Sequence, residues 1–233
     1  MAYNPSDIEI IVAFRGSVNI ANWVTNLDFL MKPYPGVSGA QVHRGFSEAF
    51  DAVSPLVVSS VQNLLSAHPN ANIVITGHSL GAALATFAAV YLKTNQMKFE
   101  VDNNISAAVD LKTKLNIPST RITFYTFGSP RTGNQAFTDY LYSLYPTSGS
   151  QRVTHYNDVV PHLPPTVLGF NHFGDEIWYK NAGTDLTYTT CKNVAGKQED
   201  LSCSSSIYAT GIEAHLIYLG KSFTGICKQP QAK

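Results

Sequence analysis

The chain has 233 residues, enough for one sizeable core, and we expect a single domain over residues 1–233. Basic and acidic side chains balance at 16 each, so no net field would attract a nucleic acid. No apolar run is long enough to span a membrane, and the opening residues, MAYNPSDIEI, lack the pattern of a signal peptide.

The first predicted elements are a strand at 8–17, IEIIVAFRGS, and a helix directly after it. In the segment after Ser17, the apolar residues recur at the i, i+3, i+4 and i+7 positions of one helical face. They are Ile20, Trp23, Val24 and Leu27. From periodicity alone, a surface helix packed on the core and a mobile cover over a site are equally good interpretations.

Next come an amphipathic helix, predicted from Val53 to His68, and a strand at 72–76, NIVIT. The strand leads into Gly77-His78-Ser79-Leu80-Gly81, and an Ala- and Leu-rich helix is predicted after it. A G-x-S-x-G motif arises by chance in about one chain in ten of this length. The elements on either side of the motif therefore decide whether its serine is a nucleophile. A buried strand before the motif and a helix after it are the context of a nucleophile elbow, in which a strained turn exposes the serine hydroxyl. The sequence therefore favours Ser79 as a nucleophile over an ordinary polar turn.

Residues 94–119 are polar and are predicted to be an insertion. Beyond them the sequence predicts strands at 121–127, 151–155, 176–180 and 186–190, a helix at 135–145, and a helix or turn at 215–220. Strands that alternate with helices predict an α/β fold, with a largely parallel sheet and helices on both faces.

A serine nucleophile needs a histidine to take its proton and a carboxylate to orient that histidine. In this fold class the chain order is serine, acid, histidine. Asp158 follows a strand and precedes Pro161, which puts it at a strand's carboxyl end. Other acids after Ser79 include Asp102, Asp110, Asp139, Asp175, Glu176 and Asp185. We expect Asp102 and Asp110 to be solvated charges and Asp139 to face water.

Four histidines follow the serine at some distance: His155, His162, His172 and His215. His155 lies inside a predicted strand, where a hydrogen-bonded core role is expected. His162 and His172 are candidates to line the site, and His215 lies late in the chain, as the order requires. His78, beside the serine, is expected to support the elbow.

The three cysteines are Cys191, Cys203 and Cys227, and none has the C-x-x-C spacing of a zinc site. A Cys191–Cys203 bridge would close a short polar loop and would imply an oxidising compartment. Asn104-Ile105-Ser106 is a glycosylation sequon, which gives weak support for secretion.

Six motifs occur in the order FRGS, VHRGF, TGHSLGAALA, GSPRTGN, RVTHYNDVVPHLPP and AHLIYLG. Together they resemble the secreted fungal class 3 lipases, from about Ile8 to Cys227. The resemblance implies an α/β-hydrolase fold and a triacylglycerol lipase with Ser79, Asp158 and His215 as the triad, the three residues that chain order also favours. It further implies an oxyanion hole made by Ser17 and the backbone N–H of Leu80.

The resemblance also implies a lid over residues 20–27, whose tryptophan matches Trp23. The implied substrate is a lipid or other ester at an oil–water interface. The protein is expected to be a secreted monomer with no metal and no organic cofactor. Family members carry a longer stretch before the first strand, and one of its cysteines pairs with the position of Cys227. The chain is therefore expected to lack that stretch and to leave Cys227 unpaired.

Two other functions remain open. Feruloyl esterases share these motifs and carry a more polar segment in place of the lid, so a soluble-ester esterase is the first alternative. A non-catalytic member that binds lipid or a partner is the second, although a binding module has no need of a complete triad.

Overall fold

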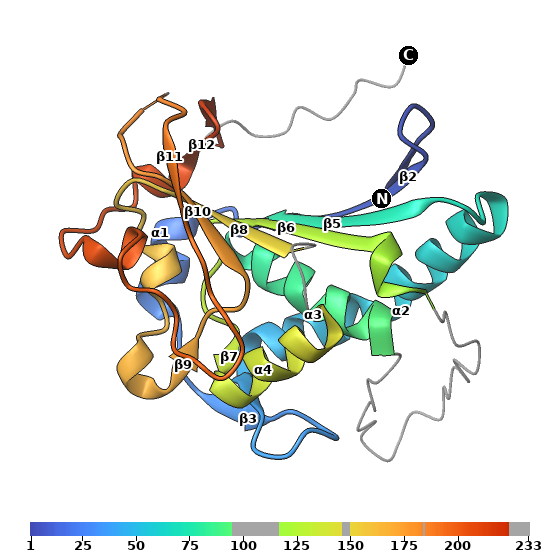
Figure 1. The fold of residues 1–233 in the computed structure, drawn as a ribbon, viewed down its shortest axis with the longest axis horizontal. Coiled ribbons are helices and arrows are strands. Elements are labelled where there is room, and N and C mark those ends of the chain that lie inside the picture. The colour runs from blue at the N-terminus through green and yellow to red at the C-terminus, as the bar shows by residue number, and fades with distance from the viewer. Residues whose placement is uncertain (95–116, 146–149, 184, 224–233) are drawn as a thin grey trace.

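A mostly parallel sheet forms the centre of the molecule (Figure 1). The structure is a computed structural model, and it describes residues 1–94, 117–145, 150–183 and 185–223. Within these residues the sheet has seven strands in the order β1-β2-β5-β6-β8-β10-β11. The inner five are parallel, and the edge strands β1 and β11 pair antiparallel. Their bounds are β1 (Ala2–Asn4), β2 (Glu9–Phe14), β5 (Asn72–His78), β6 (Ile122–Phe127), β8 (Ser150–His155), β10 (Asp175–Tyr179) and β11 (Tyr188–Cys191).

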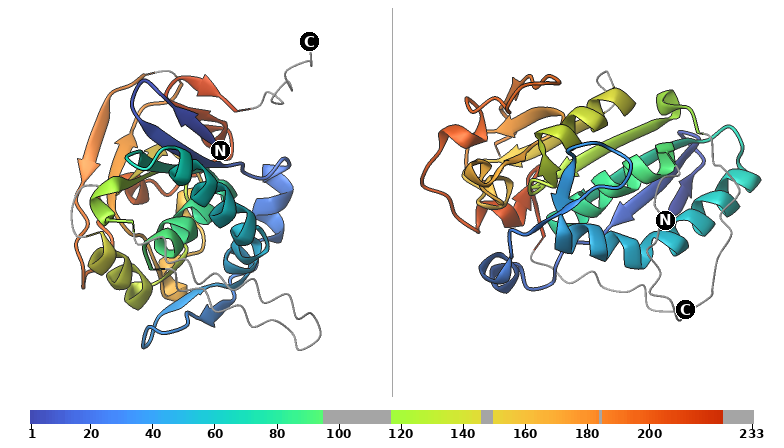
Figure 2. Two further views of the ribbon diagram at one scale, coloured as in Figure 1. Left: turned by 90° about the vertical axis from the view of Figure 1, so that its right-hand side faces the viewer. Right: turned by 90° about the horizontal axis from the view of Figure 1, so that it is seen from below.

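The long helices of the described residues lie together on one face of this sheet (Figure 2). They are α2 (Arg44–Ala67), α3 (Leu80–Thr94) and α4 (Gln135–Leu144). From β2 to β5, β6 and β8, each new strand is added on the same side of the previous one. Right-handed crossovers then place every connecting helix on the same face. The sequence predicted helices on both faces of the sheet. In the described residues, this strand order places the three long helices on one face.

The main core lies between that face and the helices. Ile73 and Ile75 of β5 are completely buried there, and Phe50, Phe87 and Phe137 from the three helices fill the space below them. Every residue of α3 from Gly81 to Leu92 is buried. A helix that is apolar on all sides belongs in the interior of a protein. The Ala- and Leu-rich run after the elbow therefore forms the central helix of the core.

Helix α2 begins at Arg44, nine residues before the predicted start at Val53. The ring of His43 caps it by accepting the backbone N–H of Phe46 (3.3 Å). Pro55, which cannot donate to the Asp51 carbonyl one turn earlier, lies inside the helix, and the Ser54 hydroxyl donates to that carbonyl instead (3.0 Å). The predicted start at Val53 was wrong for two reasons. The N-cap is a histidine, and the helix continues through Pro55 because the Ser54 hydroxyl replaces the hydrogen bond that the proline cannot make.

Smaller elements surround the sheet. A four-stranded sheet is made by β3 (Met31–Pro33), β4 (Gln41–His43), β7 (Gly133–Asn134) and β9 (Phe170–Asn171). The Cys191–Cys203 disulfide joins the end of β11 to the loop beyond it, as predicted. Near the end of the described chain, a 3-10 turn (Ala214–Leu216) leads into the hairpin of β12 (Ile217–Tyr218) and β13 (Lys221–Ser222). The structure therefore has both a turn and a strand where a helix or turn was predicted.

None of the helices in the described part of the chain combines the length and apolar character that crossing a membrane requires. Cys227, the sequon at Asn104, and the candidate acids Asp102 and Asp110 lie outside the described residues.

Candidate active site

Ser79 occupies a sharp turn between β5 and α3, at the carboxyl end of β5. Its φ angle is +59°, in the left-handed region that non-glycine residues rarely adopt. The backbone N–H of Ser79 is held by the Phe127 carbonyl on the neighbouring strand (3.0 Å). The Ser79 hydroxyl is fully buried and has no hydrogen-bond partner within the described residues. The strained turn is the one predicted for the elbow, whereas the predicted exposure of the hydroxyl was wrong, because the hydroxyl is buried.

The two glycines of the motif let strand and helix approach each other closely. A Cβ on Gly77 would collide with the carbonyl oxygen of Gly81, and one on Gly81 would collide with the carbonyl oxygen of Phe14. Each position therefore tolerates no side chain without moving the backbone around Ser79. The G-x-S-x-G spacing is a packing requirement of this turn.

Asp158 lies three residues beyond the end of β8, and its side chain is buried. One carboxylate oxygen, Oδ1, accepts the backbone N–H of Val160 (2.8 Å). The other, Oδ2, accepts Nδ1–H of His215 (2.7 Å) and the hydroxyl of Tyr218. The carboxylate is therefore fixed by three donors and faces the imidazole of His215.

His215 lies in the 3-10 turn before β12 and is completely buried. Because Nδ1 is bonded to Asp158, the ring presents Nε2, which has no hydrogen-bond partner in the part of the chain described. A backbone bridge between Asp158 and Gly211 joins the two loops that carry the acid and the histidine. The structure thus brings Asp158 and His215 together as predicted.

His78 links the elbow to the histidine loop. Its Nε2–H donates to the backbone carbonyl of His215 (2.9 Å), and its ring stacks on that of Phe223, with centroids 4.6 Å apart. Burial, together with the nearby His215, lowers the pKa of His78 to about 4. The ring is therefore a neutral donor near neutral pH, which agrees with its predicted supporting role.

The backbone around Ser17 and Leu80 lies next to Ser79. A Cβ on Gly16 would be 3.1 Å from the Ser79 Cβ and 2.7 Å from the His78 carbonyl oxygen, so the loop carrying Ser17 runs directly against the elbow. Leu80 is the first residue of α3, where a backbone N–H has no partner inside the helix. Ser17 does not cap the next helix, because Asn19 does so by accepting the N–H of Asn22 (3.2 Å).

Helix α1 (Ile20–Asn26) has the face that the sequence predicted. Ile20, Trp23, Val24 and Leu27 are half-buried, while the other residues of the helix are exposed. Trp23 stacks near Phe46 of α2, with ring centroids 6.0 Å apart. A cavity of about 380 Å³ lies between α1 and α2 and is also lined by Leu80, the residue after Ser79. None of the helix is fully buried, so α1 is attached to the core by one apolar face only.

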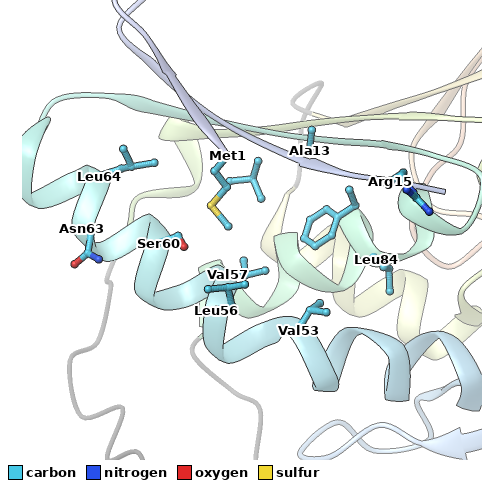
Figure 3. Close-up of a pocket in the computed structure, with 12 residues that line it drawn as sticks. Met1, Ala13, Arg15, Val53, Leu56, Val57, Ser60, Asn63, Leu64 and Leu84 are labelled. Atoms are coloured by element: carbon cyan, nitrogen blue, oxygen red, sulfur yellow. The ribbon is translucent and has the colours of Figure 1, made fainter. Parts of the chain in front are cut away.

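A second, larger cavity of about 620 Å³ lies between β2 and α2 (Figure 3). Its walls are mostly apolar, with Val53, Leu56 and Leu64 along α2 and Met1 and Phe14 opposite them. No residue of the Ser79–His215–Asp158 cluster lines it. The larger of the two cavities is therefore separate from these three residues.

Two candidate histidines have structural roles. His172 is buried, and its Nε2 bonds to the carbonyl of Pro161 (2.9 Å). His162 is held by the carbonyls of Asp158 (2.9 Å) and Ser204 (3.2 Å). The ring nitrogens of His162 and the Nε2 of His172 lie within hydrogen-bonding distance of backbone carbonyls of the surrounding loops. That the two rings line the site stays a prediction. His155 has its predicted core role and bonds through Nδ1 to the Ala214 carbonyl (2.9 Å).

The other candidate acids in the described residues bind partners away from His215. Asp175 pairs with Lys192 (2.6 Å), Glu176 pairs with Arg152 (3.0 Å), and Asp185 is bonded to Asn181 in an exposed turn (2.6 Å). Asp139 is half-buried and accepts the backbone N–H of Gly196 (2.6 Å), so the expectation that it faces water was wrong.

Sequence reasoning missed Tyr218 and Gly128. Tyr218 shares the carboxylate oxygen of Asp158 with His215. Gly128 follows the end of β6 and has a φ angle of +55°. Its backbone passes close to both side chains, because a Cβ there would be 2.8 Å from His215 Cε1 and 2.9 Å from the Tyr218 hydroxyl. The motif AHLIYLG held the tyrosine, but only the fold shows what it contacts.

Comparison with known proteins gives consistent matches. Residues 11–168 match the family model described as lipase (class 3). The chain is 35% identical over 211 residues to the secreted mono- and diacylglycerol lipase 1 of Fusarium solani, covering 90% of this chain and 56% of that protein. It is 34% identical over 228 residues to a lipase of Rhizomucor miehei, covering 97% of this chain and again 56% of the relative. The chain therefore spans little more than half the length of these curated relatives.

Solved structures agree with the sequence matches. The Rhizomucor miehei triacylglyceride lipase superposes with a TM-score of 0.78 at 31% identity, covering 95% of this chain and 75% of that one. Lipase II from Rhizopus niveus gives 0.79 at 32% identity, covering 94% and 73%. The predicted α/β-hydrolase fold is confirmed. With the Ser79 elbow and the family model both inside residues 11–168, the chain belongs to the class 3 lipases.

Proposed function

We propose that this chain hydrolyses the carboxylic esters of acylglycerols through an acyl-enzyme on Ser79. One observation carries the proposal: the carboxylate of Asp158 holds His215 through Nδ1 (2.7 Å). Among the described residues, neither His215 Nε2 nor the Ser79 hydroxyl has a hydrogen-bond partner. A serine with a histidine base and an orienting acid is the general arrangement for acyl transfer. The names of the relatives, lipases of mono-, di- and triacylglycerols, support an acylglycerol as the substrate.

In the first half of the reaction, Ser79 Oγ attacks the ester carbonyl carbon, and its proton passes to His215 Nε2. The resulting imidazolium is stabilised by Asp158 through Nδ1–H. The tetrahedral intermediate then collapses, the ester C–O bond breaks, and His215 gives its proton to the departing alkoxide. The acyl group remains on Ser79, and the glycerol portion leaves.

In the second half, water attacks the acyl-enzyme and His215 takes one of its protons. Collapse of this intermediate releases the fatty acid and returns the proton to Ser79. In both halves the negative oxygen requires donors, and we assign the backbone N–H of Leu80 and the N–H and hydroxyl of Ser17. Loss of one such donor typically costs about 3–4 kcal/mol of transition-state stabilisation.

Helix α1 is proposed as a lid. Ser79 and His215 are both completely buried, so a substrate needs a rearrangement before it can reach them. Helix α1 is a suitable moving part because it contacts the core through one apolar stripe and begins three residues after Ser17. When it swings away, that stripe becomes exposed, and a lipid surface would compensate the cost. We further propose that the protein works as a secreted monomer at an oil–water interface; a relative named as secreted and the Cys191–Cys203 disulfide support secretion.

The test is hydrolysis of tributyrin and of a short-chain nitrophenyl ester by the protein and by Ser79→Ala. We expect the substitution to abolish both activities, because no other group supplies the nucleophile. Ser59→Ala is the matched control, since Ser59 is exposed on α2 and its hydroxyl donates to the Leu56 carbonyl (3.2 Å), away from the Ser79 turn. Full activity in Ser79→Ala would reject the proposal, and a protein that binds emulsions without cleaving either ester would favour a non-catalytic role.

A further inference from the structure

The side chain of Tyr218 is buried beside the candidate triad and points its hydroxyl at Asp158. Tyr218 belongs to β12, three residues after His215, and only 2% of it is accessible to solvent. Its hydroxyl donates to Asp158 Oδ2, the same oxygen that accepts Nδ1–H of His215. Two donors from one short segment therefore converge on one carboxylate oxygen.

The surroundings of Tyr218 keep its hydroxyl in that position. Its ring packs edge-on against His78 (centroids 5.3 Å apart), His155 (5.8 Å) and Phe127 (6.2 Å). Gly128 leaves just enough room for the hydroxyl, because a Cβ there would be 2.9 Å from it. These contacts keep the ring oriented with its hydroxyl toward Asp158.

The phenol is a permanent donor. Burial, followed by the negative charge of Asp158 and its hydrogen bond, raises the pKa of Tyr218 well above its usual range, and Glu176 adds to this effect. Besides Asp158 and Glu176, the titratable groups facing this cluster are His78 of β5, His155 of β8 and His215 itself. Among them, only Asp158 accepts a hydrogen bond from the Tyr218 hydroxyl.

We propose that Tyr218 is a positioning residue that sets the basicity of His215 through the shared oxygen of Asp158. A donor on Oδ2 withdraws negative charge from that oxygen, which weakens the attraction of the carboxylate for the imidazolium form of His215. The same bond holds the carboxylate in line with Nδ1. With Tyr218 in place, His215 is a weaker base than it would be beside Asp158 alone. Its imidazolium form therefore gives its proton to the leaving group more easily. The rate consequence rests on the proposed function, but the effect on His215 itself does not.

The experiment compares Tyr218→Phe with Tyr145→Phe. Tyr145 is a matched control because it is also buried, and its hydroxyl bonds to a backbone carbonyl, that of Ala89, outside the site (2.8 Å). The pKa of His215 is measured by NMR titration of its ring in each protein. The pH dependence of kcat and KM is measured on a dissolved nitrophenyl ester.

For Tyr218→Phe we expect the His215 pKa and the acid limb of kcat/KM to rise together by about half to one pH unit. At the plateau, kcat should fall about tenfold with KM unchanged, because Asp158 loses one of its three fixed donors. Tyr145→Phe should leave the His215 pKa in place. An unchanged His215 pKa in a folded Tyr218→Phe protein would overturn the proposal.

Replacement of Tyr218 by 3-fluorotyrosine provides a second test that preserves the packing. Fluorine makes the phenol a stronger donor, so the His215 pKa should move in the opposite direction, downward. A shift of the same sign as in Tyr218→Phe would contradict the proposal even if the phenylalanine variant is unstable. If Ser79→Ala retains activity, the proposed function fails, while the NMR titrations still decide the role of Tyr218.

Discussion

The ring of His78 donates a hydrogen bond to the backbone carbonyl of His215, at 2.9 Å. This contact joins residues 137 positions apart and ties the turn that carries Ser79 directly to the turn that carries the candidate base. Because the carbonyl can only accept, the bond requires His78 Nε2 to carry a proton. It holds the backbone of His215 independently of Asp158, which holds the ring.

His78 makes the stability of the protein depend on pH. Its pKa is lowered to about 4 in the folded protein, against an ordinary value of 6.5, because burial penalises the charged form. The unfolded chain therefore binds the proton at a higher pH. We expect the free energy of unfolding to fall as pH drops from about 6.5 to 4 and to be insensitive to this group above and below that window. The contribution is on the order of 3 kcal/mol. Urea unfolding across pH 4–8 measures it.

His78→Gln is the control for that measurement, because it keeps a donor for the His215 carbonyl but does not titrate. The slope of stability against pH should become shallower in this variant. Some slope should remain, since burial also lowers the pKa values of His43 and His172. An identical slope in both proteins would show that His78 does not couple protonation to folding.

Gly128→Ala should inactivate the protein. An added Cβ would stand 2.8 Å from His215 Cε1 and 2.9 Å from Nδ1, and the φ angle of +55° disfavours any side chain there. His215 must then move away from Asp158, so hydrolysis of a dissolved ester should drop at least about a hundredfold. Gly183→Ala is the comparison, because Gly183 also has a positive φ but no other atom of the described residues lies within 4 Å of its Cβ position, its chain neighbours aside. If both variants keep full activity, the close approach at Gly128 does not position His215.

Removal of the disulfide should lower stability without affecting chemistry. The Cys191–Cys203 bridge closes a loop with a sequence separation of 12, and the double substitution to serine should cost about 3 kcal/mol. The midpoint of urea unfolding measures this loss, with activity at low urea as the control. Thiol titration of the denatured, unreduced protein should find one free group, Cys227. Three free thiols would contradict the bridge in solution.

The triad variants Ser79→Ala, His215→Ala and Asp158→Ala should each lower kcat severely, and pairs of them should lose little more than the worst single variant. Residues that act as a unit are strongly non-additive. Hydrolysis of one dissolved ester by all six proteins tests this expectation. Multiplicative losses in the double variants would mean that one of the three residues acts separately.

Trp23→Ser separates a lid from an ordinary surface helix. Trp23 provides the largest side chain on the apolar stripe of α1 and packs near Phe46. Its loss should reduce activity on a tributyrin emulsion far more than activity on dissolved esters, while Trp23→Phe should keep most of both. The unchanged protein should become sharply more active once tributyrin exceeds its solubility. A smooth hyperbolic curve through that limit, with equal losses on both substrates, would favour a soluble esterase.

Local sequence patterns were sufficient to predict several structural features of this protein. The strand, the glycines and the helix around Ser79 predicted the elbow, because the requirements of that turn lie within about ten neighbouring residues. The periodicity of Ile20, Trp23, Val24 and Leu27 predicted which face of α1 turns inward, since helical geometry fixes it. Chain order narrowed the acid and the base to a few candidates, among them Asp158 and His215.

Only the tertiary structure decided which side chains meet. The bonds of Asp158 to His215 and to Tyr218 span 57 and 60 positions, so no period or spacing in the sequence encodes them. His162 and His172 matched the residue type and the order but are held by backbone carbonyls, which a sequence does not display. The common face of α2, α3 and α4 follows from the order in which strands join the sheet. Sequence specifies the local turns and stripes, whereas long-range packing selects the partners, because the contacts that align a carboxylate with an imidazole exist only once distant strands are paired.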